Sequence, residues 1–367
     1  KYIIIIMRRL IFISFFALIV ALNAVAGKRD ASSDSDKQYL IVGVAFYNLE
    51  NLFDTINANG KYDLEFSPQG ARKWDSDKYW KKVNNLARAI SAMATPETPL
   101  GPAIIGISEV ENRSVVEDLV KAVDNRLAEE GRDPWGLQIV HHESPDLRGI
   151  DVALLYNPLY FAVENVTAHT LVIPDNPDFR TRDQLCVTGS LLDKPMSFIV
   201  NHWPSRLGGQ DESSYLREAA GELSKHIADS LWTVNPDQGV IVMGDLNDDP
   251  FDKSCAKSLG AVRDMKKAKP HGFYNPFWRV LDHGVGTLAY RGKWNLFDQI
   301  ILSGNLVDGE DVGLQYWKCT VFNKRFLRTP SGQYKDTPLR TYSRGEFLNG
   351  YSDHFPTEIF LLREVTE

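Results

Sequence analysis

The chain has little cysteine, no excess of positive charge and no apolar run of the length of a typical membrane span. Only three cysteines occur among 367 residues, and their spacing matches no zinc motif, which argues against a disulfide scaffold and a structural zinc site. The formal net charge is −7, so bulk electrostatics would not hold the chain on nucleic acid. If the substrate is a phosphate ester, a local group must overcome this repulsion.

Residues 1–26 are expected to be a signal peptide and not part of the fold. Arg8 and Arg9 follow Met7, Leu10–Leu22 is apolar, and Ala24–Ala26 forms an A-x-A cleavage signature. The apolar run is shorter than the roughly 20 residues that span a bilayer. We therefore expect translation to start at Met7, and the cleaved chain, without a transmembrane anchor, to be secreted or periplasmic.

The remaining chain is expected to comprise a polar linker at 27–38 and one domain at 39–367. Amphipathic helices are predicted at 77–94, 114–131 and 213–232, because apolar residues recur there at helical spacing. Strands are predicted at 39–49, 103–110, 151–157, 185–192, 196–203, 239–247, 297–303 and 357–362. Many strands with few intervening helices predict two packed sheets with helices outside them.

Polar side chains of catalytic type lie at the ends of these strands. They are Asn48, Glu50, Glu109, His202, Asp245, Asn247, Asp353 and His354. One such residue alone is typical of a turn or cap, but strand ends meet at one edge in layered α/β folds. Carboxylate and amide oxygens suit Mg²⁺ or Mn²⁺, and histidines suit proton transfer. A catalytic histidine usually needs a carboxylate partner, for which Asp151 and Asp298 are candidates.

The sequence also resembles a known family. YNLENLF, ISEVEN, GIDVALLY, NHWPS, GDLND, FDQIILS and YSDHFP occur in the order found in the endonuclease/exonuclease/phosphatase superfamily, over about residues 40–362. This group of metal-dependent phosphoesterases includes pancreatic-type deoxyribonuclease, abasic-site endonucleases, neutral sphingomyelinases and inositol-polyphosphate 5-phosphatases. The resemblance implies an α/β (α+β) fold, a four-layer α/β/β/α sandwich of two mainly antiparallel sheets with the site at one end.

The resemblance further implies a metal site. Glu109 looks like the principal metal ligand, with Asn48 and Glu50 beside it and Asp353 as a further carboxylate on the metal side. Asn48 could instead cap a turn. The implied ion is Mg²⁺, with Mn²⁺ or Ca²⁺ as alternatives.

The catalytic residues are implied in the same way. His202 resembles the first catalytic histidine with Asp151 as its partner, and His354 resembles the second with Asp298 as its partner. Asp245 resembles the residue that orients the attacking water.

The phosphate-binding residues remain more open. Asn247 resembles a residue that holds the scissile phosphate, and Arg182 resembles a phosphate-contacting arginine. Arg180 competes with Arg182 for that role. Asp151 could be a strand-end residue paired with Arg148 instead of a histidine partner.

Substrate choice is expected to lie in the loops at 201–217 and 271–294. The second loop interleaves aromatic residues with Arg279 and Arg291, which is typical of stacked bases and phosphates but equally of a packed aromatic cover. The sequence therefore predicts a secreted hydrolase of phosphodiesters, with a nuclease acting on DNA or nucleotides favoured. The alternative is a phosphomonoesterase or phospholipid-headgroup phosphodiesterase of the sphingomyelinase or inositol-phosphate phosphatase type. A non-catalytic binding protein on the same scaffold is remote, and no stable protein partner is implied.

Overall fold

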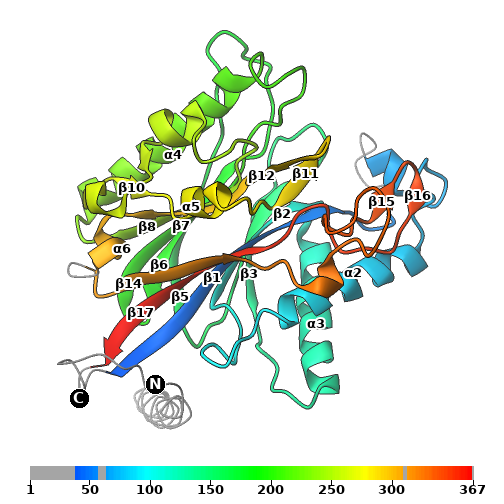
Figure 1. Ribbon diagram of the computed structural model, residues 1–367, viewed down its shortest axis with the longest axis horizontal. Helices are drawn as coiled ribbons and strands as arrows, with labels where there is room; N and C mark the ends of the chain where they lie inside the picture. Colours follow the sequence, from blue (N-terminus) through cyan, green and yellow to red (C-terminus); the bar gives the residue numbers. More distant parts are fainter. Residues whose placement is uncertain (1–37, 57–62, 309–311, 366–367) are drawn as a thin grey trace, which may run out of the picture.

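A computed structural model describes residues 38–56, 63–308 and 312–365. The predicted signal peptide, and all of the predicted linker except Gln38, lie outside the described residues. The described chain forms two large β-sheets with helices on their outer faces (Figure 1). Among the described helices, none combines the length and the apolar character needed to cross a bilayer.

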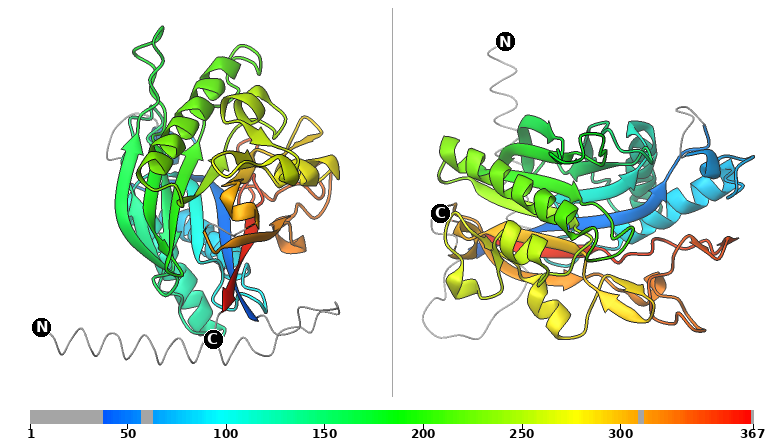
Figure 2. Two further views of the ribbon diagram at one scale, coloured as in Figure 1. Left: turned by 90° about the vertical axis from the view of Figure 1, so that its left-hand side faces the viewer. Right: turned by 90° about the horizontal axis from the view of Figure 1, so that it is seen from above.

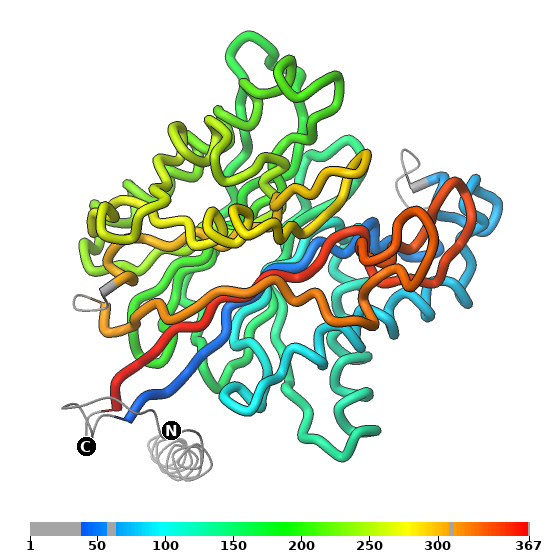
Figure 3. The backbone as a smooth tube through the Cα atoms, viewed as in Figure 1, coloured from blue at the N-terminus to red at the C-terminus, as the bar shows by residue number. Residues whose placement is uncertain are grey.

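The first sheet has β1 near its centre. Its strand order is β14-β17-β1-β2-β4-β3. The strands are β1 (Gln38–Leu52), β2 (Ile104–Val110), β3 (Gln138–His141), β4 (Asp151–Tyr156), β14 (Gln315–Val321) and β17 (Thr357–Val365). β1 pairs in parallel with β2 and antiparallel with β17, so the blue and red ends of the described chain run side by side (Figure 3).

The second sheet brings three polar residues to one level. Its order is β5-β6-β7-β8-β13-β10-β9. The strands are β5 (Phe161–His169), β6 (Gln184–Leu191), β7 (Lys194–His202), β8 (Gly239–Asp245), β9 (Ala261–Val262), β10 (Phe273–Tyr274) and β13 (Asp298–Ser303). Asp245 on β8 lies opposite His202 on parallel β7 and opposite Asp298 on antiparallel β13. Pairing alone therefore aligns these side chains at one sheet edge.

The two sheets face each other across the main apolar core. Residues of β1, β2 and β4 pack there against residues of β7, β8 and β13. Gly106 on β2 allows a close approach, because an added Cβ would lie 2.8 Å from Met243 Sδ on β8. The catalytic edge is thus built from both sheets.

Helices cover the outer faces of the sheet pair (Figure 2). α2 (Ser76–Ser91) and α3 (Arg113–Glu129) pack on the first sheet, and α4 (Ser214–Val234) forms a second core with β7 and β8. The side chain of Asp75 accepts a hydrogen bond from Lys78 N and caps α2. The predicted apolar face of this helix is buried. These layers confirm the predicted sandwich.

The remaining described elements are short. They are η1 (Asp63–Phe66), η2 (Ser254–Ser258), η3 (Met265–Lys267), α5 (Phe277–Asp282), α6 (Asn305–Asp308), η4 (Arg325–Leu327) and the hairpins β11 (Leu288–Tyr290)–β12 (Lys293–Asn295) and β15 (Tyr342–Ser343)–β16 (Glu346–Phe347). The β11–β12 hairpin lies in the connection between β10 and β13, and the β15–β16 hairpin lies in the connection between β14 and β17. Such connections are where substrate contacts are usually found.

Candidate active site

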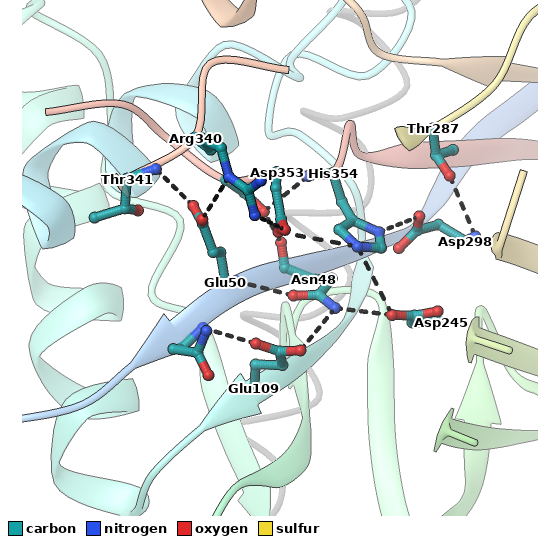
Figure 4. A network of polar contacts seen from close by, with 12 residues as sticks. Asn48, Glu50, Glu109, Asp245, Thr287, Asp298, Arg340, Thr341, Asp353 and His354 are labelled. Carbon is teal, nitrogen blue, oxygen red and sulfur yellow. Dashed lines mark hydrogen bonds and ion pairs between the residues drawn. The ribbon is translucent and has the colours of Figure 1, made fainter. Parts of the chain in front are cut away.

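Asp245 contacts several polar residues at the sheet edge, and Figure 4 shows it beside Asn48 and His354. Its Oδ2 accepts a hydrogen bond from Asn48 Nδ2 at 2.9 Å. The same oxygen lies 3.6 Å from His202 Nε2 and 3.9 Å from His354 Nε2. Burial raises the pKa of Asp245 to about 7. The structure therefore brings residues from three distant chain segments around one carboxylate oxygen.

Glu109 faces the same oxygen from the other sheet. The pairing of β2 with β4 skips from Ser108 to Val110, and Glu109 adopts a left-handed φ of 62°. Its Oε1 lies 3.4 Å from Asn48 Nδ2 and 3.9 Å from His202 Nε2. This strained conformation turns a strand residue into the site, as is common for functional side chains.

His354 and Asp298 form the predicted histidine–carboxylate pair. His354 Nδ1 lies 2.6 Å from Asp298 Oδ2, and Asp298 is fully buried. Burial by itself would lower the pKa of His354, but the charges of Asp298 and Asp245 outweigh it and hold the pKa well above its ordinary value. His354 is therefore a cation whose free Nε2 faces Asp245.

His202 differs from His354 because its ring is neutral. Asp151, its predicted carboxylate partner, contacts other residues. Burial, with the nearby positive charges of Arg182 and Arg148, lowers the pKa of His202 well below its ordinary value, so the ring is neutral. Its Nδ1 has no hydrogen-bond partner within the described residues. Asp151 instead accepts from Ser144 N at 2.9 Å and contacts His141 Nε2 at 3.0 Å. Both Asp151 alternatives, His202 and Arg148, are thereby replaced.

Arg182 does not reach toward a phosphate. It is buried, and it donates from Nε to His202 O, from Nη2 to Trp203 O and from Nη1 to Asp146. Nε and Nη2 thus hold the chain that leaves β7, which positions His202, and Nη1 ties it to Asp146 in the loop between β3 and β4. The competing Arg180 donates to carbonyl groups of its own loop. The contacts of Arg182 therefore support a positioning role, and the phosphate-contacting role predicted for Arg182 or Arg180 stays a prediction.

Glu50 also differs from its predicted place beside Glu109. Its carboxylate turns to the opposite side, where it accepts from Thr341 N at 2.6 Å and from Arg340 Nε at 3.3 Å (Figure 4). Burial and the neighbouring Asp353 raise the pKa of Glu50 to about 7. Its backbone N–H donates to Asn48 Oδ1, so Asn48 both closes this turn and reaches the central carboxylates.

Asn247 and Asp353 are the last two of the predicted site residues. Asn247 donates its backbone N–H to Asp245 Oδ1 at 3.0 Å and its side-chain amide to Trp203 O at 3.0 Å. Asp353 accepts from Arg340 Nη2 at 2.6 Å and lies 3.9 Å from His354 Nε2. Asn247 therefore orients Asp245, and Asp353 lies at the outer side of the site.

The donor set fits a divalent cation. Asn48 Nδ2 lies 3.4 Å from Glu109 Oε1 and 2.9 Å from Asp245 Oδ2, and carboxylate oxygens of this kind are the ligands that Mg²⁺ prefers. Donor atoms of Asp245, Asp298 and His354 also lie within 4.8 Å of one another. Asp298 and His354 are already bonded to each other, so Glu109 is the residue that would hold the ion.

The family assignment follows from the sequence. A model of the Endonuclease/Exonuclease/phosphatase family matches residues 43–363. The chain belongs to this family. Its members are phosphoester hydrolases that typically depend on a divalent metal, so the chain is an enzyme that acts on phosphate ester bonds. No curated protein matches the chain in a sequence comparison.

Solved structures of the endonuclease/exonuclease/phosphatase family share the fold. A family protein from Bacteroides thetaiotaomicron is 16% identical, with a TM-score of 0.53 over 90% of this chain and 98% of that one. A mannosyl-6-phosphatase from the same species is 15% identical, with a TM-score of 0.52 over 87% and 99%. TDP2 from C. elegans is 14% identical, with a TM-score of 0.50 over 88% and 75%.

Proposed function

We propose that the chain is a secreted, Mg²⁺-dependent phosphodiesterase, and that its substrate is a nucleic acid or nucleotide. The observation that supports hydrolysis is the surroundings of Asp245 Oδ2, which a neutral and a protonated histidine approach from two sides. Titratable groups whose pKa values are shifted in different directions by their surroundings are typical of acid–base catalysis.

In the proposed reaction a water attacks the phosphorus atom in line with the leaving oxygen. Asp245, with a pKa of about 7 and oriented by Asn247, accepts the proton of the attacking water near neutral pH. His354 donates a proton or hydrogen bond from Nε2 to the leaving or non-bridging oxygen, while Asp298 holds its ring. Neutral His202 donates a further hydrogen bond. A divalent ion held by Glu109 would withdraw charge from the phosphate oxygens.

The β11–β12 hairpin supports a nucleic-acid substrate. Trp294 on β12 stacks on Phe355, the residue after His354, with ring centroids 6.2 Å apart and planes at 19°. Trp294 and Tyr290 are exposed, and the guanidinium of Arg291 lies 5.1 Å from the Tyr290 ring centroid. Exposed aromatic rings with adjacent cations are what a flipped or single-stranded base requires.

The same hairpin is tied directly to the catalytic residues. Thr287, just before β11, accepts from Phe355 N through its carbonyl at 2.8 Å, and its Oγ1 accepts from Asp298 N at 3.4 Å. A base stacked on Trp294 would therefore lie in fixed relation to His354. This geometry favours the substrate-binding interpretation of the loop at 271–294 over a purely packed cover.

A substrate panel tests this function. We expect the chain, loaded with Mg²⁺, to cleave single-stranded oligonucleotide and bis-p-nitrophenyl phosphate faster than p-nitrophenyl phosphate, sphingomyelin or inositol phosphates, and to stop with chelator. Trp294→Ala should lower cleavage of the oligonucleotide but not of the small diester, whereas exposed Trp80→Ala on α2 should change neither. Preference for a monoester, or equal rates of Trp294→Ala and wild type on DNA, would refute the nuclease.

Secretion is tested separately. Expression from Met7 in a bacterial host should yield a processed protein outside the cytoplasm that begins near Gly27. An unprocessed cytoplasmic chain would refute the predicted signal peptide.

A further inference from the structure

The site residues differ in how much of each side chain is exposed to solvent. The side chains of Asp245 and Asp298 are 4% and 0% exposed, whereas that of Asp353 is 32% exposed. Arg340 and Arg148 are more open still, at 48% and 45%. We take this exposed side of the site, which carries the two arginines, as the opening through which a substrate enters; Arg182 is buried.

Arg148 lies on the Glu109 side of this opening. Its Nη2 lies 3.7 Å from Glu109 Oε2 and contacts Asn51 Oδ1. Within the described residues its Nε and Nη1 donate to no protein atom. Arg148 thus presents unused donors at the mouth of the site, in contrast to Arg182, whose three nitrogens are all bonded to the protein.

Arg340 lies on the Asp353 side and is held by a buried support. Its Nε and Nη2 donate to Glu50 and Asp353, which leaves Nη1 unused among the described residues. The adjacent Thr341 donates its N–H to Glu50 and accepts from Lys82 Nζ at 2.6 Å. Lys82 on α2 is fully buried. The guanidinium is therefore held by contacts that extend to the buried side chain of Lys82.

We propose that Arg148 and Arg340 bind the phosphate oxygens of the substrate from opposite sides of the opening. This inference rests on the proposed function, because it assigns the contacts of that same site. Glu109, Asp245 and Asp353 bring several carboxylates to the site, and an anionic substrate that enters a protein of net charge −7 needs local cations. A planar guanidinium with free donors is suited to phosphate.

Phosphate binding and steady-state kinetics test the pair. Calorimetric titration with inorganic phosphate in the presence of Mg²⁺ should give a Kd about 10- to 100-fold weaker for Arg148→Gln and for Arg340→Gln than for wild type. KM for bis-p-nitrophenyl phosphate should rise similarly, with a smaller change in kcat. Arg148→Lys and Arg340→Lys should each retain part of the affinity that the Gln variants lose. Arg263→Gln is the matched control, because Arg263 is exposed and ion-paired to Asp282 away from the site.

Two further readouts separate substrate binding from support. If Arg340 only held Asp353, Arg340→Gln would weaken Mn²⁺ binding, measured by electron paramagnetic resonance, and would leave phosphate affinity at fixed metal occupancy unchanged; that result would overturn the inference for Arg340. Wild-type phosphate affinity in Arg148→Gln would overturn it for Arg148. If no phosphodiester is cleaved but phosphate affinity still depends on both arginines, the proposed function fails and the inference stands.

Discussion

Replacing Asp298 by Asn tests the charge state on which the proposed chemistry depends. Asp298 is fully buried with Oδ2 2.6 Å from His354 Nδ1, and Asn can still accept that hydrogen bond through its side-chain oxygen. The substitution therefore removes the charge and keeps the shape. Burial lowers the pKa of His354, and without the charge of Asp298 only the remaining carboxylates offset this effect.

The size of the effect follows from the close contact. An opposite charge at this range shifts a pKa by about 1–3 units, and each unit corresponds to about 1.4 kcal/mol. We therefore expect the pKa of His354 in Asp298→Asn to fall by about that much. If protonated His354 is the acid, the alkaline limb of the kcat profile moves to lower pH by the same amount, and the loss of activity is largest at high pH.

Two measurements check this prediction. The pH dependence of kcat gives the alkaline limb, and the ring-proton titration of His354 followed by NMR gives its pKa without any substrate. Asp193→Asn is the control, because Asp193 is exposed in the turn between β6 and β7, at the end of β7 opposite to His202. An alkaline limb and a ring titration that stay at their wild-type positions in Asp298→Asn would refute the reasoning.

Three other substitutions test separate parts of the structure. Asp245→Asn should lower kcat by about 10²–10⁴ while thermal unfolding shows an intact fold, and near-wild-type turnover would contradict its role as base. Buried Glu358 on β17 has a pKa raised to about 8 by burial, so its ionisation disfavours the folded state increasingly as pH rises from 4.5 to 8. Glu358→Gln should therefore add about 3 kcal/mol of stability at pH 7 and almost none at pH 4.5, measured by urea unfolding; an equal gain at both pH values would contradict the assigned charge. Lys82→Met should cost about 3 kcal/mol, because it removes the buried cation beside Glu50 and the donor to Thr341 Oγ1 and the carbonyl of Tyr351, and an unchanged urea midpoint would show that the network contributes nothing.

Much of the fold could be predicted because apolar runs and helical spacing are local signals. The face of α2 that carries Val83, Leu86 and Ile90 is buried as its period predicts. β5 escaped prediction because it is an edge strand whose middle residues are exposed, so it lacks a clear apolar pattern. β3 also escaped prediction, because it is only four residues long.

The site was predictable where a residue follows a strong strand. His202, Asp245 and Asp298 meet because their strands are neighbours in register, which places strand-end residues together. The partner of Asp151 could not be found by the same reasoning, because His141 approaches Asp151 only through the antiparallel pairing of β3 with β4. The signal was present in the short loop between His141 and Asp151, because antiparallel β3 and β4 bring these two residues onto neighbouring strands.

The arginines show a different limit of sequence reasoning. Arg182 and Arg148 both lie near strand ends, and the sequence around them does not reveal which side chain is buried. Arg182 is enclosed because the carbonyl groups of His202 and Trp203 turn toward it. Arg340 lies far from any strong motif and enters the site only through its contacts with Glu50 and Asp353.

Anomalous diffraction from a crystal soaked in Mn²⁺ tests most directly whether these scattered residues surround one divalent ion. We expect a single strong site with a Glu109 carboxylate oxygen at about 2 Å from the ion, and with Asp245 and the rings of His202 and His354 lining the same pocket. Donor atoms of His141, Glu143 and Asp151 also lie within 4.8 Å of one another. An ion bound by that group alone, with Glu109 free of metal, would contradict the account.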